Sequence, residues 1–181
     1  EIPVIPGLEV AAFSRPAQIV GGDYFDFVHF RDGAYGLAIA DVAGHGVAAG
    51  LLMASVQTAL HTLIPLSDAP DEVIGRINEF FCHNIHMTTF VTLFLARFDP
   101  QSYTLEYANA GHNPPLHVHT NGTVAPATWL RPTAPAVGLV EKFVVRNRTL
   151  TMAPGDVLLL YTDGVTEAIN PAEEEFGVDR L

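Results

Sequence analysis

Three aspartates of this chain stand beside glycines at points where an apolar run meets a turn. Asp23 directly follows two glycines, Asp41 ends the apolar run 36–40, and Asp163 ends the run 157–162. A carboxylate at the mouth of a hydrophobic strand is costly unless it is paired or binds a cation. Capping of a turn or helix explains any one of them alone. Three in the same setting favour metal chemistry.

The type of ion follows from the ligands on offer. Carboxylate and backbone oxygens, without a thiolate cluster or a compact histidine set, suit Mn²⁺ or Mg²⁺ better than zinc. Two such ions about 4 Å apart can hold a phosphoryl group for in-line attack by a bridging hydroxide. The chain has no Gly-x-Ser-x-Gly motif, and its one cysteine, Cys82, lies in a helical pattern where a buried structural thiol is expected. Metal-activated water is therefore the expected nucleophile.

Composition narrows the class of protein. The formal net charge of -11, from 20 acidic and 9 basic residues, disfavours binding to a nucleic acid. With 181 residues and 49% hydrophobic content we expect a single domain. Polar residues interrupt the longest apolar runs, so no membrane contact is predicted. The single cysteine fits a reducing compartment, which predicts a cytoplasmic location, and the lack of an initiator Met predicts an excised fragment.

Hydrophobic periodicity and turn signals predict the elements that position these aspartates. They are strands at 8–13, 24–30 and 35–41, helices at 47–64 and 68–85, and strands at 90–98, 103–109, 116–119, 143–150 and 156–162. Residues 31–34 read as a hairpin turn and residues 121–122 as another turn. Helices in the middle with strands on both sides favour an α+β architecture of antiparallel sheets with helices on their outer faces over an alternating βαβ fold.

Five segments, in order over nearly the whole chain, resemble the bacterial protein phosphatase 2C-like (PPM) family, and within it the sporulation protein E and sigma-B regulator U branch. They are residues 20–27, 41–46, 90–94, 108–115 and 154–167. The resemblance implies that residues 1–181 form one PPM-type domain. Its fold would be a four-layer α-β-β-α sandwich of two mostly antiparallel sheets flanked by helices, with the metal site at one edge between the sheets.

The resemblance also implies roles for individual residues. Asp23, Asp41 and Asp163 match the metal-binding and catalytic aspartates, and Val42 matches a position whose backbone carbonyl binds metal. The intact domain would hold two Mn²⁺ or Mg²⁺ ions. The family's further aspartate, in a segment resembling Asp-Asp-x-Thr, has no counterpart here, so the final helix and strand are expected to lie outside this sequence.

The activity implied is metal-dependent hydrolysis of phosphoserine or phosphothreonine in bacterial signalling. The implied substrate is a phosphorylated STAS-type anti-sigma-factor antagonist, and the implied neighbour in the full-length protein is an N-terminal sensor or regulatory domain. A homodimer is left open. A catalytically silent partner-binding module of the same fold is the rival function, and a metal hydrolase of small phosphoesters is a third; retention of the three aspartates argues against a silent module.

Three further side chains could support the ligands. Asp26 lies three residues after Asp23, where strand alternation would turn it to the opposite face unless a bulge intervenes. His45 could orient a metal-bound water or a substrate phosphate, or only shape its glycine-flanked loop. Glu167 lies close enough to Asp163 for a water-mediated contact with metal, although a helix-start acid explains it equally well.

Other polar residues carry weaker signals. Asn109, His112 and Asn113 belong to a loop shaped by Gly and Pro, near the active site or at the edge of a sheet. His117 and His119 would face the same way in a strand, yet the sequence shows no third ligand nearby, which favours surface residues over a zinc site. Arg15 is expected to be a solvated arginine rather than a phosphate ligand.

Overall fold

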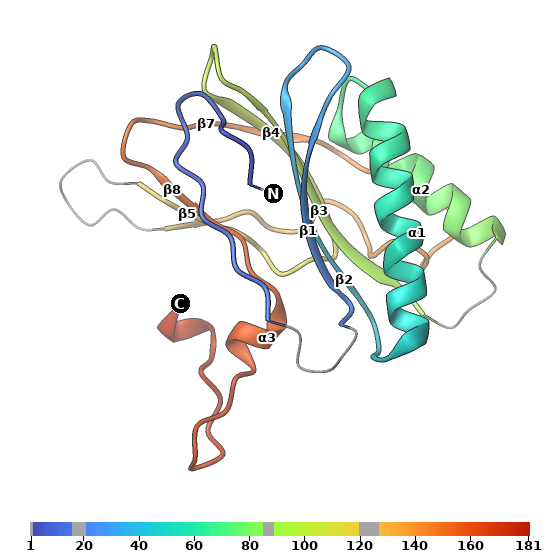
Figure 1. The fold of residues 1–181 in the computed structure, drawn as a ribbon, viewed down its shortest axis with the longest axis vertical. Coiled ribbons are helices and arrows are strands. Elements are labelled where there is room, and N and C mark those ends of the chain that lie inside the picture. The colour runs from blue at the N-terminus through green and yellow to red at the C-terminus, as the bar shows by residue number, and fades with distance from the viewer. Residues whose placement is uncertain (1, 16–20, 85–88, 120–126) are drawn as a thin grey trace.

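A computed structural model describes residues 2–15, 21–84, 89–119 and 127–181 of the chain (Figure 1). The predicted helix end at residue 85 and the predicted turn at 121–122 lie outside these residues. The described part forms two antiparallel sheets with two long helices on one side, which is the α+β architecture expected from the sequence.

The larger sheet has five strands in the order β1-β2-β3-β4-β7. Its strands are β1 (Asp23–His29), β2 (Tyr35–Val42), β3 (Val91–Asp99), β4 (Thr104–Ala110) and β7 (Arg148–Thr151). Both faces of the central strand β3 are covered: Leu93 and Leu95 pack on the helices, whereas Phe94 and Phe98 lie in a second core on the other side. This alternation follows from the two-residue period of a strand.

Two helices cover one face of this sheet, as Figure 1 shows. They are α1 (Val47–Leu63), extended by the 3-10 turn η1 (Ile64–Leu66), and α2 (Pro70–Asn84). In α1 the side chains of Leu52, Val56 and Leu60 are buried in the core beneath the helix. Contrary to the sequence expectation, residues Val47–Leu66 are long and apolar enough to cross a membrane by length and composition alone, but in this structure they pack on a sheet.

The smaller sheet has three strands in the order β6-β5-β8. They are β5 (Leu116–Val118), β6 (Thr128–Trp129) and β8 (Val157–Leu159). A second core between the two sheets contains Phe94, Tyr107 and Leu130, with Leu158 of β8 packed against it. The described residues therefore show three stacked layers, helices, sheet and sheet, in the order expected for the first three layers of the sandwich.

Three predicted strands differ from the observed structure. Residues 9–15 pair with no strand, and the N-terminal segment forms only the isolated bridge between Ile5 and Leu8. The predicted strand 143–150 is paired only from Arg148, where β7 runs beside the N-terminal half of β4. The predicted strand 156–162 is paired at 157–159; it is followed by the short helix α3 (Asp163–Thr166), and the 3-10 turn η2 (Val178–Arg180) lies near the end of the chain.

Candidate active site between the two sheets

Asp23 and Asp41 face each other across the first hairpin. The register of β1 and β2 pairs Asp23 with Asp41 directly, and residues opposite each other in an antiparallel pair have Cβ atoms about 4.5–5.5 Å apart on the same face. Phe27 and Ile39, on the same face as these aspartates, pack in the core between the sheets. Both carboxylates therefore lie at the end of the larger sheet, on the side of the smaller one.

Asp163 approaches Asp23 and Asp41 from the smaller sheet. It is the first residue of α3, shortly after β8. Burial is the largest cause of the raised pKa of Asp23 and of Asp41, and the negative charge of Asp163 contributes to both, so Asp163 lies within electrostatic reach of both. The side chain of Thr162, the residue just before Asp163, acts in the opposite direction on the pKa of Asp23 and therefore lies near it.

The pKa of Asp41 is raised from 3.8 to about 6. Burial is the largest cause, followed by the charges of Asp23 and Asp163 and by the smaller effect of Glu167; the hydrogen bond from the Val42 N–H acts in the opposite direction. Four carboxylates thus share one electrostatic field. Among the described residues, no three of them bring ligand atoms within 4.8 Å of one another, so the cluster is wider than a pocket for one bare ion.

Gly22 brings the backbone close to this cluster. A Cβ atom at Gly22 would lie 2.8 Å from the Val42 carbonyl oxygen and 3.0 Å from Oδ1 of Asp41. Side-chain carbon at such distances forces the neighbours to shift, so glycine is required for this approach. The carbonyl of Val42 and the carboxylate of Asp41 therefore converge on one small space, and both are oxygen donors of the kind that Mn²⁺ and Mg²⁺ bind.

Side chains that the sequence analysis did not single out hold the Asp41 loop. The Thr89 hydroxyl donates to the Ala43 carbonyl at 2.8 Å, and the Ala43 N–H donates to the Phe90 carbonyl at 3.0 Å. Thr92, which pairs with Asp41 across β2 and β3, lies 2.8 Å from Nδ1 of His112. Only the three-dimensional pairing of β3 with β2 reveals these contacts, because these residues lie more than 40 positions from Asp41 in the sequence.

Asn109 and His112 have structural roles beside the cluster. Asn109 is fully buried; its Nδ2 donates to the carbonyls of His112 and Leu130, each at 3.1 Å, and its Oδ1 accepts from the His112 N–H at 2.8 Å. Burial lowers the pKa of His112 to about 4, so its ring is neutral at physiological pH. The Asn109 side chain therefore closes the loop after β4, and the His112 ring contacts Thr92 of β3.

Asp26 does not support the cluster. It points to the helical side of β1, where its carboxylate accepts from the Tyr24 hydroxyl and lies 2.6 Å from Nε2 of His61 on α1. Strand alternation without a bulge produces this orientation. His45 is exposed in the loop between β2 and α1, and Arg15 is exposed in the N-terminal segment. Among the supporting candidates, Glu167 is the one whose charge acts on Asp41.

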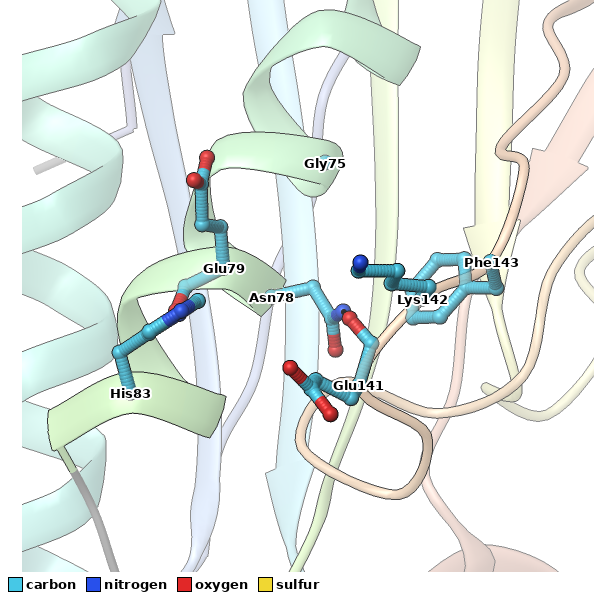
Figure 2. Close-up of a pocket in the computed structure, with 7 residues that line it drawn as sticks. All are labelled: Gly75, Asn78, Glu79, His83, Glu141, Lys142 and Phe143. Carbon is cyan, nitrogen blue, oxygen red and sulfur yellow. Dashed lines mark hydrogen bonds between the residues drawn. The ribbon is translucent and has the colours of Figure 1, made fainter.

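A hollow of about 420 Å³ lies elsewhere, between α2 and residues 141–143 (Figure 2). Asn78 forms its inner wall, since its side chain bonds the carbonyls of Val140 and Glu141 and the N–H of Gly138. The helix α2 covers the face of the larger sheet opposite to Asp23 and Asp41. This hollow therefore has no part in the aspartate cluster.

Comparisons with known proteins identify relatives of this chain. The sequence profile of stage II sporulation protein E (SpoIIE) matches residues 31–181. The chain is 28% identical over 167 residues to the protein named phosphoserine phosphatase RsbU of Bacillus subtilis, covering 92% of this chain and 49% of RsbU. The chain thus spans about half the length of this relative.

Solved structures show the same fold. The RsbU and RsbW domains of Rv1364c from Mycobacterium tuberculosis superpose with a TM-score of 0.70 at 31% identity, covering 84% of this chain and 42% of that one. The SiaA-PP2C domain of Pseudomonas aeruginosa superposes with a TM-score of 0.73 at 24% identity, covering 91% and 65%. With the profile match and the two-sheet fold, these similarities show that the chain belongs to the SpoIIE family and has the fold of a PP2C-type phosphatase domain.

Proposed function

We propose that this chain is the catalytic domain of a metal-dependent serine/threonine phosphoprotein phosphatase of bacterial signalling. One observation carries the proposal: Asp23 and Asp41 face each other across the first hairpin at one end of the space between the sheets, and burial together with the charge of Asp163 raises the pKa of both. A relative of this chain carries the name of a phosphoserine phosphatase. Closely spaced carboxylates repel one another, and a bound cation would relieve this repulsion.

Asp23, Asp41, Asp163 and the Val42 carbonyl are the proposed ligands of two Mn²⁺ or Mg²⁺ ions. Gly22 leaves room for the oxygens of Asp41 and Val42 to face one small space, which fits a hard cation. When bound, the ions would supply a nucleophilic water and positive charge for the phosphoryl oxygens. Protein residues support the oxygen donors: Thr162 lies near the carboxylate of Asp23, and the Thr89 hydroxyl holds the loop after Asp41 through the Ala43 carbonyl.

The proposed substrate is a phosphoserine or phosphothreonine of a STAS-type anti-sigma-factor antagonist. The similarity to RsbU, which is named a phosphoserine phosphatase, supports the phosphoserine part of this proposal. We further propose that a regulatory domain precedes this domain in the full-length protein and that the site faces the cytoplasm. We also propose that the exposed His45, in the loop that follows Asp41, contacts an incoming phosphoprotein.

An activity assay with a matched pair of variants tests the proposal. Asp163→Asn removes a ligand charge at constant shape, and Asp179→Asn makes the same change at an exposed site in η2. We expect Mn²⁺-dependent release of phosphate from a phosphoserine peptide. Loss of a group that only orients a metal ligand lowers metal affinity or activity about 10–100-fold, and loss of a ligand itself should cost more. Asp163→Asn should therefore lower kcat/KM by at least about 100-fold. Asp179→Asn should leave kcat/KM unchanged.

The same assay separates the other functions. Wild-type protein without turnover in Mn²⁺ or Mg²⁺ that still binds an antagonist would be a silent partner-binding module. Faster turnover of nucleotides than of phosphopeptides would make the chain a hydrolase of small phosphoesters. Undiminished activity of Asp163→Asn would remove this aspartate from the site.

A further inference from the structure

A second cluster of ligating side chains lies on the smaller sheet. His117 is in β5, His119 follows that strand, and Asp156 directly precedes β8. One nitrogen of each imidazole and one carboxylate oxygen all lie within 4.8 Å of one another, and no other three His, Cys, Asp or Glu residues among those described meet this criterion. The sequence analysis lacked the third ligand because Asp156 is distant in the chain and adjacent only through the pairing of β5 with β8.

Both histidines point at the same carboxylate oxygen. Nε2 of His117 lies 2.9 Å and Nδ1 of His119 lies 3.3 Å from Oδ2 of Asp156, and the two rings are 4.1 Å apart between centroids. In a tetrahedral site with bonds of about 2.0–2.1 Å to nitrogen and oxygen, neighbouring ligand atoms are roughly 3.3 Å apart. The observed distances thus differ from those of such a site by a few tenths of an ångström at most.

The carboxylate is buried and fixed in position. The side chains of His117 and Asp156 are only 3% and 4% exposed, whereas that of His119 is 40% exposed. The Ala153 N–H donates to Oδ2 of Asp156 at 3.0 Å, and the Asp156 N–H donates back to the Ala153 carbonyl at 3.0 Å, which closes the turn before β8. An outer hydrogen bond of this kind orients a metal-ligating carboxylate. The exposed ring of His119 leaves a path from solvent.

We propose that His117, His119 and Asp156 form a binding site for a divalent transition metal of the zinc class. Two imidazoles and one carboxylate match the ligands of Zn²⁺, and imidazole nitrogen distinguishes this site from the all-oxygen aspartate cluster. A bound ion would cross-link β5 to the turn before β8. With three protein ligands, a water molecule would take the fourth position of a tetrahedral ion, and the ion would stabilise the smaller sheet.

This site is separate from the aspartate cluster. Asp156 directly precedes β8, whereas Asp163 lies four residues beyond Leu159, the last residue of that strand. No residue of the aspartate cluster belongs to the group of ligand atoms around Asp156. The proposal does not depend on the phosphatase activity, because its test measures binding and stability.

The test is a titration of the metal-free protein with Zn²⁺, and with Co²⁺ as a spectroscopic probe, in excess Mg²⁺ to occupy the aspartate cluster. We expect one Zn²⁺ per chain, a tetrahedral Co²⁺ absorption band, and a rise in Tm with Zn²⁺. His119→Gln keeps a side chain able to donate to Asp156 but removes the imidazole. Loss of a group that only orients a ligand lowers metal affinity about 10–100-fold. Because His119 is itself a proposed ligand, this variant should bind Zn²⁺ at least about 100-fold more weakly.

Control variants make each outcome decisive. His29→Gln removes an exposed imidazole elsewhere and should bind Zn²⁺ as the wild type does, and Asp163→Asn should keep both the Co²⁺ band and the rise in Tm. Asp156→Asn should lose both the Co²⁺ band and the rise in Tm. If Asp156→Asn fails to fold, His119→Gln still tests the proposal, because the side chain of His119 is partly exposed. Unchanged Zn²⁺ affinity in His119→Gln, loss of Zn²⁺ binding in Asp163→Asn, or no Zn²⁺ binding by the wild type would each overturn the proposal.

Discussion

Replacement of Asp41 by Asn should stabilise the metal-free protein. The folded structure raises the pKa of Asp41 from 3.8 to about 6 through burial and the charges of Asp23 and Asp163. The ionised carboxylate therefore destabilises the folded state. A shift of about two units corresponds to about 3 kcal/mol. Because Asp41 is only partly buried, solvent screening reduces this to roughly 1.5 kcal/mol. Asn has the same shape, and its side-chain oxygen can still accept the hydrogen bond from the Val42 N–H. The free energy of unfolding of Asp41→Asn should therefore exceed that of the wild type by this amount.

The effect depends on pH with a definite sign. Between about pH 4 and pH 6 the folded wild type binds more protons at Asp41 than the unfolded chain does, so its stability falls as the pH rises. Below pH 4 the carboxyl is neutral in both states, and the difference between Asp41→Asn and the wild type should vanish. Above pH 6 the difference should be complete.

Thermal unfolding in a chelating buffer measures this. At pH 7.5 the Asp41→Asn variant should unfold roughly 3–6 °C above the wild type, since about 1 kcal/mol moves Tm by about 2–4 °C in a chain of this size. Asp26→Asn is the matched control. Burial acts to raise the pKa of Asp26, but hydrogen bonds with Tyr24 and His61 lower it overall, so that variant should lose stability. An Asp41→Asn variant less stable than the wild type at pH 7.5 would refute the reasoning.

Two further predictions concern residues around the cluster. Gly22→Ala places a Cβ 2.8 Å from the Val42 carbonyl oxygen; displaced ligands should lower kcat/KM on the order of 100-fold, and wild-type phosphate release would show that the close approach is dispensable. Asn109→Ala removes the three hydrogen bonds to His112 and Leu130; at about 1 kcal/mol each, urea denaturation should show a loss of about 3 kcal/mol, and a loss below about 1 kcal/mol would contradict the structural role of Asn109.

Local sequence patterns predicted the parts of the fold that local interactions determine. The first hairpin was predictable because apolar runs flank the turn at 31–34, and the register of this hairpin pairs Asp23 with Asp41. Helix α1 was predictable within a residue because Pro65 ends a long run without turn signals. In both cases the signal lies within the segment itself.

Features that depend on distant partners were missed. The segment 8–13 has the composition of a strand, yet no strand pairs with it in the described structure. The two-residue strand β6 exists only because Thr128 and Trp129 lie against β5. Likewise the role of Thr162 beside Asp23, and of Asp156 beside His117, depends on the packing of sheets and not on spacing along the chain.

The direct pairing of Asp23 with Asp41 sets a rule for tolerated changes in length. Side chains alternate along a strand, so deletion of one residue within β1 would send Asp23 to the helical side, where Asp26 now lies. Composition and hydrophobicity would hardly change, yet the two carboxylates would no longer meet. Asp163 reaches the cluster from the other sheet, so the connections between Asp41 and Asp163 carry no such constraint. Insertions and deletions in homologous chains should therefore spare β1 and β2 and accumulate in those connections.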